Sequence, residues 1–352
     1  MPDWSSPMQQ TYEYFIVDPG TWKDIKKLDT IKSCSITRDE DVETLGSASI
    51  GITESVGECY IRSYLVTVQN GLRERHPLGT FLVQTPASSF NGKIRDVTMD
   101  AYTPLLELKE NPPPLGYSLL KGDNIMESAY RITREHVRAP VVKTDCDDTL
   151  HNDFVANTDD TWLTYISDLI LNAKYELALD ELGRILYSPK QDIASLQPVW
   201  TYNDDDESIL YSDITIDHDL YRIPNVVEVV YTNGNENYCK RVVNDDPNSP
   251  TSTVNRGREI KHRVIDPGFI GDPTTHEIDE YAEQLLRDLS AVECTITYTH
   301  GYCPVRIGDC VRINYTRAGL KNVKAKVISQ TIKCEPGCPV TEKAVFTTNL
   351  WR

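Results

Sequence analysis

The chain has 352 residues, and its 36 Lys and Arg against 53 Asp and Glu give a formal net charge of -17. This acidity argues against a protein that grips a phosphate backbone, because nucleic-acid affinity comes from Lys and Arg that neutralise phosphates. No stretch reaches the roughly 18 apolar residues of a membrane-spanning helix. The polar N-terminus lacks the basic and apolar regions of a secretory signal, so we expect no membrane span and synthesis in a cytoplasm.

The first 110 residues are predicted to form an all-β domain. Ala48, Ile50 and Ile52 alternate with polar neighbours, and a period of two gives each strand one buried face. The expected strands are Tyr12–Val17, Ile31–Thr37, Ser47–Thr53, Glu58–Gln69, Gly79–Gln84 and Lys93–Ala101. Turn residues separate them, among them Asp18-Pro19-Gly20 and Asn91-Gly92. Short strands at this spacing indicate a barrel or a sandwich.

A proline run, Asn111-Pro112-Pro113-Pro114, ends this pattern and marks a linker, because proline cannot donate to a strand ladder. Residues 111–215 are then predicted to form an inserted α/β domain. Asp123 is expected to cap a helix that runs to about Val137. A second helix starts after Thr161, and its apolar face is expected to hold Trp162, Leu163, Ile166, Leu169, Ile170 and Ala173. Strands Tyr175–Leu179 and Arg184–Tyr187 are expected to flank the turn Asp180-Glu181-Leu182-Gly183.

Residues 216–352 are predicted to form a second β domain with one long helix, at about 273–290. Asn233-Gly234 indicates a hairpin between Asn225–Thr232 and Tyr238–Val243. Pro273 suits the first position of the helix, whereas Thr274 and Glu277 form a capping box, so the two signals place the start differently. The remaining strands are expected at Val292–Thr299, Val305–Tyr315, Val323–Ile332 and Thr341–Thr347. The fold class is therefore mainly β with an α+β insert.

Four sequence segments, taken in their order along the chain, resemble segments of the tail hub, or baseplate hub, proteins of bacteriophage tails. The run Leu78–Leu108 is similar to the close of their first barrel, and Pro224–Val229 to the start of their second. Asn244–Pro250 is similar to an N-x-x-P-x-S-P segment common in the family. Gly308-Asp309-x-Val311 resembles the family's closing barrel entry. The resemblance covers most of residues 11–348.

The resemblance implies two tail-tube-like β-barrel domains plus a small α/β domain, assembled as a homotrimer. Three copies would present six tube-like units, which adapts a sixfold tube to a threefold tip and closes the distal end of the tube. Genome DNA would pass through the lumen during ejection without specific binding. The implied location is the tail tip of a virion assembled in the host cytoplasm. The implied partners are the tail tube or distal tail protein, the tape-measure protein, and tail fibre, spike or receptor-binding proteins.

Two alternative functions stay open at this point. One is a distal tail or tail tube protein that forms a hexameric ring, although Asn225–Phe346 supplies a second barrel that a tube subunit does not need. The other is a tail-associated cell-wall hydrolase. The sequence contains neither a G-x-x-x-x-G-K-[ST] nor a G-x-G-x-x-G motif, and neither Cys146 with His151 nor Cys303 with His300 has an evident orienting third group. We therefore expect no enzymatic activity, no catalytic residues and no cofactor.

Nine cysteines, an odd number, suit thiols kept in a reducing compartment. Cys334 and Cys338 could hold one edge of a zinc site with His300 and Cys303, or could form a disulfide. Buried or idle thiols are the favoured interpretation, and no metal is expected. The acidic run Asp204–Glu207 is interpreted as a solvated loop, with a cation site as the alternative.

One basic patch stands out in this acidic chain, and it holds Arg256, Arg258, Lys261 and Arg263. Nearby Glu259 and Asp266 could balance it within a strand or loop face. The functional interpretation is an electrostatic contact with an acidic neighbour in a trimer or tube. We therefore take these four residues as expected partner contacts.

Overall fold

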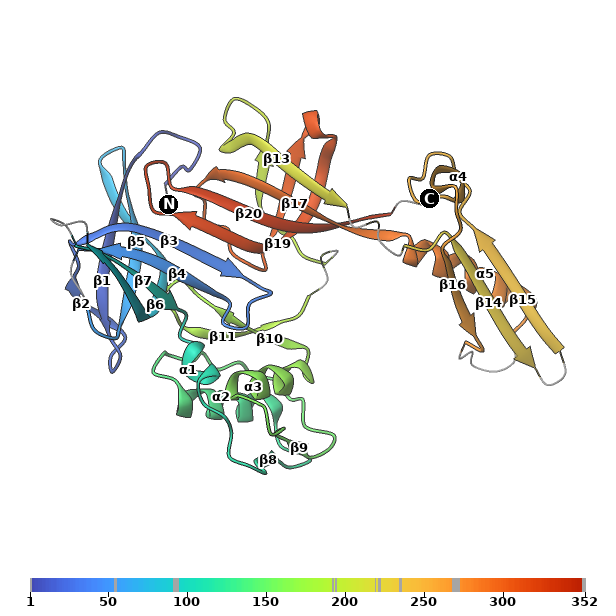
Figure 1. The fold of residues 1–352 in the computed structure, drawn as a ribbon, viewed down its shortest axis with the longest axis horizontal. Helices are drawn as coiled ribbons and strands as arrows, with labels where there is room; N and C mark the ends of the chain where they lie inside the picture. Colours follow the sequence, from blue (N-terminus) through green and yellow to red (C-terminus); the bar gives the residue numbers. More distant parts are fainter. Residues whose placement is uncertain are drawn as a thin grey trace. The chain divides into compact units, whose positions relative to one another are not determined.

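The computed structural model places the chain in two compact units, and each is described here by itself (Figure 1). It describes residues 2–53, 56–90, 95–191, 193, 195–218, 220, 223–233, 236–267 and 273–349. Unit 1 holds Met1–Ile214 and Tyr298–Lys343, and unit 2 holds Thr215–Thr297 and Ala344–Arg352. The division into domains at 1–110, 111–215 and 216–352 stays a prediction. Among the described residues, no helix is long and apolar enough to cross a bilayer.

The first β half of unit 1 contains seven strands, drawn in blue to teal in Figure 1. They are β1 (Gln9–Asp18), β2 (Lys23–Lys27), β3 (Ile31–Asp39), β4 (Gly46–Ile52), β5 (Cys59–Gln69), β6 (Leu72–Phe90) and β7 (Arg95–Tyr102). All six predicted strands are confirmed, and β6 begins well before the predicted Gly79. The sequence did not reveal β2, because its residues KDIKK show no alternation of apolar and polar side chains. Asn91-Gly92 lies outside the described residues.

The second β half contributes six strands and one short 3-10 helix. They are β12 (Pro198–Asn203), β13 (Leu210–His218), β17 (Ala291–Gly301), β18 (Cys310–Tyr315), η1 (Thr316–Ala318), β19 (Leu320–Lys333) and β20 (Pro339–Asn349). Strand β19 pairs with β3 in antiparallel fashion, so the two halves join in one sheet of order β13-β17-β20-β19-β3-β4-β7-β6-β5-β1-β2, with β18 and β12 branching from β19. Ile36 and Ile50 of the first half share a core with Ile332 and Val340 of the second.

The fold is mainly β, as predicted, but two closed barrels are not confirmed. Hydrogen bonding among the described strands follows an open path that ends at β13 and β2. Alternation of apolar residues fixes which face of a strand is buried, but it does not specify the partner of each edge. The joining of the halves through β3 and β19 was therefore not predictable from the strand pattern.

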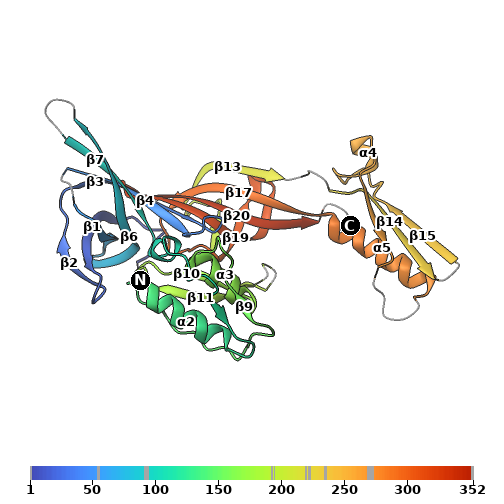
Figure 2. The same ribbon diagram turned by 60° about the horizontal axis from the view of Figure 1, so that its bottom comes forward.

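The insert packs as a small helical layer with two short sheets, drawn in green in Figures 1 and 2. Its elements are α1 (Leu106–Lys109), β8 (Ser118–Leu119), α2 (Ile125–His136), β9 (Phe154–Val155), α3 (Trp162–Leu171), β10 (Tyr175–Leu179) and β11 (Ile185–Pro189). The predicted apolar face of α3 is confirmed, because all of its members are buried. Asp123 is not the cap of α2. Asn124 caps it, because its side chain accepts from the Glu127 amide, whereas Asp123 accepts from the Leu120 amide.

Unit 2 is a three-stranded sheet covered by one helix. Its elements are β14 (Val226–Asn233), β15 (Glu236–Val243), α4 (Thr253–Arg256), β16 (Lys261–Ile265) and α5 (Thr275–Leu289), with sheet order β15-β14-β16. Helix α5 packs Ile278, Ala282 and Leu286 against β14. Thr274 caps α5 with the predicted capping box, so Pro273 precedes the cap and does not occupy the first helical position. Gly234 and Asp272 lie outside the described residues.

Candidate functional site

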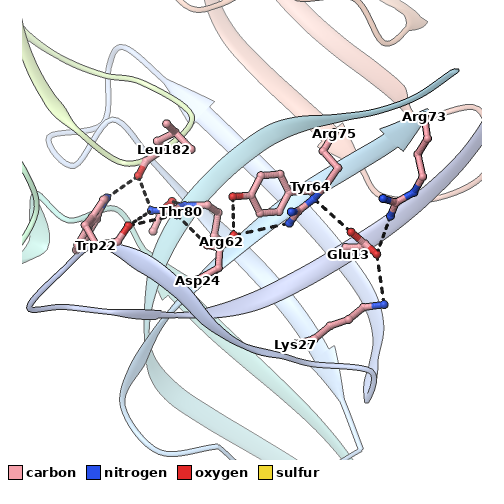
Figure 3. Close-up of polar contacts among 10 residues, drawn as sticks. All are labelled: Glu13, Trp22, Asp24, Lys27, Arg62, Tyr64, Arg73, Arg75, Thr80 and Leu182. Atoms are coloured by element: carbon pink, nitrogen blue, oxygen red, sulfur yellow. Dashed lines mark hydrogen bonds and ion pairs between the residues drawn. The ribbon is translucent and has the colours of Figure 1, made fainter. Parts of the chain in front are cut away.

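The tip of the β10–β11 hairpin is the point where the insert meets both β halves within unit 1. The carbonyl of Leu182 accepts hydrogen bonds from the Trp22 indole N–H at 2.7 Å and from Arg62 Nη2 at 3.1 Å (Figure 3). Gly183 has a φ of +74°, and a Cβ there would lie 2.8 Å from Thr80 Cβ. Only glycine meets both the conformation and the close approach. We call the residues Asp180-Glu181-Leu182-Gly183 the hairpin tip.

Arg62 is the charged residue that holds the hairpin tip in place. It is 4% exposed. Its Nε donates to Thr80 Oγ1 at 2.8 Å, and its Nη1 contacts Asp24 Oδ1 at 2.8 Å. A buried guanidinium is tolerated where its donors are satisfied and an acid compensates its charge. Arg62 therefore links β5, β6 and β2 of the first β half to the insert.

Charged residues of both signs continue from this point along β1, β2 and β6 (Figure 3). Arg75 lies 3.7 Å from Asp24 and 3.3 Å from Glu13, and its guanidinium stacks 4.1 Å above the Tyr64 ring. Arg73 contacts the same Glu13 at 3.0 Å. The side chains of Arg75 and Arg73 are 36% and 55% exposed, so each outer pair contributes little to stability.

Glu181 connects the hairpin tip to the second β half. Its Oε1 lies 2.6 Å from Arg306 Nε and 3.9 Å from Arg38 Nη1 of β3. Arg38 also donates to Gln330 Oε1 at 3.0 Å and to the Leu78 carbonyl at 2.6 Å. One carboxylate therefore contacts cations from both β halves, and it does so from the insert.

A cavity of about 680 Å³ lies beside the hairpin tip, within unit 1. Its walls come from the hairpin and from both β halves. Two ion pairs lie in its walls, Lys326 with Glu40 at 2.6 Å and Arg306 with Glu181. In the described part of the chain, no group of three His, Cys, Asp or Glu is placed to hold a metal ion. The cavity therefore lies where the insert packs against the two β halves of unit 1.

A second polar cluster lies fully inside the second β half, around Glu342 of β20. Glu342 and His300 are both 0% exposed, and His300 Nε2 lies 3.3 Å from Glu342 Oε1. The Tyr298 hydroxyl donates to Glu342 Oε2 at 2.6 Å, and Gln330 Nε2 donates to Oε1. His300 Nδ1 faces the Gly301 carbonyl at 2.6 Å. Because both ring nitrogens face acceptors, the geometry fits a charged imidazolium.

The pKa values in this cluster follow from its geometry. Burial by itself would lower the pKa of His300, but the Glu342 carboxylate and the Cys303 side chain together outweigh burial and raise it to about 10. Burial opposes ionisation of Glu342, yet the charge of His300 and the hydrogen bonds around the carboxylate hold its pKa below the usual value. The cluster is therefore an internal ion pair with satisfied partners.

We expect alkaline pH to weaken unit 1 through His300. A folded pKa raised from 6.5 to about 10 means that its contribution is complete below pH 6.5 and is lost as pH rises through 10. The free energy of unfolding, measured by urea titration, should therefore fall between pH 7 and pH 10. His300→Gln should show a shallower slope over that range, because it lacks the titrating group. Equal slopes in the two proteins would contradict this assignment.

The four residues of the possible zinc site, His300, Cys303, Cys334 and Cys338, do not form one cluster in the structure. Cys303 lies beside Tyr202 and His300, at 3.2 Å and 3.9 Å from their side-chain atoms, whereas Cys334 lies beside Cys34. Cys303 and His300 are buried, so that pair is closed to a substrate. Cys146 Sγ donates to Asp148 Oδ2 at 3.4 Å. In the acidic run, Asp204 accepts from the amide and hydroxyl of Thr316.

The basic patch lies in unit 2, where acids of the same unit contact much of it. Arg263 contacts Glu228 of β14 at 2.6 Å, and Lys261 contacts Glu228 at 3.3 Å and Glu259 at 3.2 Å. These cations lower the pKa of Glu228, chiefly through the Arg263 hydrogen bond. Arg256 donates to the carbonyls of Ile223 and Leu220. Arg258 is exposed and takes part in none of the ion pairs found among the described residues.

The sequence pattern missed the residues that organise these sites: Trp22, Arg62, Glu181, Glu228, Gln330 and Glu342. Asp266 was expected to balance the basic patch, but its carboxylate accepts from the Thr232 amide. The hairpin tip was recognised only as a turn. No local signal could identify the rest, because their partners lie on distant strands.

No protein family model and no curated protein sequence matches this chain. Among solved structures, it is similar to a tail protein from Neisseria meningitidis, with a TM-score of 0.59, 14% identity, and 97% of this chain and 98% of that chain covered. It is also similar to a 43 kDa tail protein of prophage MuSo2 from Shewanella oneidensis, with a TM-score of 0.62, 10% identity, and coverage of 96% and 98%.

A chain of the Francisella PdpA–VgrG complex matches with a TM-score of 0.54 and 8% identity, over 97% of this chain and 53% of that chain. Identities this low establish a shared fold. The resemblance predicted from the sequence is confirmed at that level: this chain has the fold of phage and prophage tail proteins.

Proposed function

We propose that this chain is a structural tail protein of a phage or phage-like particle, and that it acts as the hub at the distal end of the tail tube. The observation that carries this proposal is the match to two tail proteins over nearly the whole length of both chains. A match of this extent includes the insert and the second β half together with the first. The proposal therefore concerns the whole chain and not one shared domain.

The construction of unit 1 supports a role that depends on rigidity. The two β halves share a sheet through β3 and β19 and share a core, and the hairpin tip ties the insert to both. We propose that each half supplies one tube-like unit, so that a homotrimer presents six units and matches a sixfold tube to a threefold tip. In this role the net charge of -17 lets genome DNA pass through the lumen without adhering.

We further propose that the protein is not an enzyme and that its partners are virion proteins. These would be the tail tube or distal tail protein, the tape-measure protein, and a fibre, spike or receptor-binding protein. In the unit 1 cavity, Lys326 pairs with Glu40 and Arg306 pairs with Glu181, and in the interior His300 pairs with Glu342. These pairings favour a structural use of both sites. In unit 2, Arg256, Lys261 and Arg263 would shape a basic surface whose exposed Arg258 contacts an acidic neighbour.

Native mass spectrometry of the purified full chain tests the proposed assembly. We expect a particle of three times the chain mass of 39.9 kDa. Six copies would instead indicate a hexameric ring protein, and a monomer at micromolar concentration would contradict the hub proposal. Arg258→Glu should leave the monomer folded by circular dichroism and should weaken binding to an acidic tail partner, with Lys321→Glu as an exposed control. Cleavage of peptidoglycan by the pure protein would overturn the non-enzymatic assignment.

A further inference from the structure

Two cysteines face each other at the seam where β3 of the first half pairs with β19 of the second. The register pairs Ser35 with Lys333, and one step further the Cys334 amide donates to the Cys34 carbonyl at 2.9 Å. The two residues are therefore direct cross-strand neighbours, and their side chains point to the same face of the sheet. All nine cysteines of the chain are free thiols in this structure.

The spacing of such neighbours suits a disulfide. Hydrogen-bonded antiparallel pairs have Cα atoms about 5.5 Å apart, and disulfides bridge Cα separations of about 4.4 to 6.8 Å. Cys34 is 5% exposed and its sulfur lies 3.8 Å from Ser63 Oγ. Cys334 is the more exposed residue of the two, so we take it as the member of the pair that meets a reagent first.

A third thiol, Cys338, lies close to this pair but is placed differently. It is 0% exposed and has a φ of +42°, in the turn that joins β19 to β20. Its amide donates to the Glu335 carbonyl at 2.9 Å, which also accepts the Tyr12 hydroxyl. The turn therefore holds Cys338 in a strained, buried position, whereas Cys334 directly follows β19 and hydrogen-bonds to the backbone of Cys34.

We propose that Cys34 and Cys334 are a redox pair, which a small-molecule disulfide oxidises to a disulfide across the β3–β19 seam. The Cys334 thiolate attacks one sulfur of the reagent, forming a mixed disulfide and releasing one small thiolate. The Cys34 thiolate then attacks the Cys334 sulfur, forming the internal S–S bond and releasing the second small thiolate. The two protein thiols lose two electrons and two protons, and the reagent leaves as two thiols.

The pKa shifts of the two thiols favour the second attack and slow the first. The hydrogen bond to Cys334 lowers the pKa of Cys34, while the same contact, with burial, raises the pKa of Cys334. The resolving residue thus favours its thiolate form, and the first attack is slow near neutral pH. The product would join the two β halves covalently through residues far apart in sequence, where a cross-link most restricts the unfolded chain.

Tryptic peptide mapping after incubation of the full chain with oxidised glutathione tests the proposal. Cleavage after Lys32, Arg38, Lys333 and Lys343 gives two peptides of interest, Ser33–Arg38 with Cys34 and Cys334–Lys343 with the other two thiols. We expect these two peptides to be linked under non-reducing conditions and separate after reduction. We also expect the oxidised protein to have a higher thermal midpoint, an increase that reduction reverses.

The Cys338→Ser variant is the matched control, because it keeps the proposed pair and should still give the linked peptides. Cys34→Ser should no longer give the linked peptides. If that variant fails to fold, the peptide maps of the wild-type protein and of Cys338→Ser still test the proposal. A Cys334–Cys338 bridge inside one peptide would overturn the proposal, and so would thiols that stay free. A link that disappears in Cys338→Ser would assign the bridge to Cys34 and Cys338 and would also overturn it.

Discussion

Replacing Arg62 with methionine is expected to lower the free energy of unfolding by about 3 kcal/mol and to loosen the hairpin tip. Methionine keeps an unbranched aliphatic side chain but removes the guanidinium, which leaves Asp24 without its closest cation and the Leu182 carbonyl with one donor fewer. Breaking a buried pair from one side costs about 3–5 kcal/mol. Asp24 is 20% exposed, so water relieves part of that loss and the lower end of the range applies.

Urea titration measures the stability change, and hydrogen exchange of residues 175–189 measures the loosening of the hairpin. Arg73→Met is the matched control, because Arg73 belongs to the same series of charges but its side chain is 55% exposed. An exposed pair of this kind is worth at most about 1 kcal/mol. If Arg62→Met and Arg73→Met behave alike in both measurements, Arg62 does not hold the insert in place.

The elements of the insert were predictable because their signals are local. Strand β10 begins and ends where its sequence predicts, and α3 buries the predicted face behind the cap at Thr161. A helix face repeats every three or four residues, and a cap acts within four residues of the helix start. Asp123 and Asn124 are both good capping residues, so capping preference alone does not tell which of them begins α2.

The roles of the turn residues in the hairpin tip could not be predicted in this way. Asp180-Glu181-Leu182-Gly183 was recognised as a turn, but the contacts of Leu182 come from Trp22 and Arg62, and those of Glu181 from Arg306 and Arg38. Nothing near the turn indicates those partners. They are fixed by the packing of the insert against strands that lie far away in the chain.

The same limit applies to the sheet that joins the two β halves. Periodicity placed both β3 and β19 correctly as strands with one buried face. It did not indicate that they pair with each other, because register depends on neighbouring edges and turns. The juxtaposition of Cys34 and Cys334 depends on that register, which is why the sequence suggested Cys338 as the partner of Cys334.

Glu342→Gln is expected to destabilise the protein by about 3–5 kcal/mol, the range for removing one partner of a buried ion pair. Glutamine keeps the shape of the side chain, but it supplies no charge to His300. The pKa of His300 then falls, because the carboxylate that did most to raise it against burial is gone. The neutral ring can donate from only one nitrogen, so either the Gly301 carbonyl or the residue at 342 loses a donor.

A double-mutant cycle decides whether Glu342 and His300 act as a unit. Each single variant, Glu342→Gln or His300→Gln, leaves one ionisable group buried without its partner, whereas the double variant leaves none. The double variant should therefore lose less stability than the two single losses together, with a coupling of about 1–3 kcal/mol in urea titrations. Glu335→Gln, on the exposed turn before β20, should change stability by less than about 0.5 kcal/mol. Strict additivity would mean that the pair is not coupled, and the alkaline loss of stability assigned to His300 would then need another source.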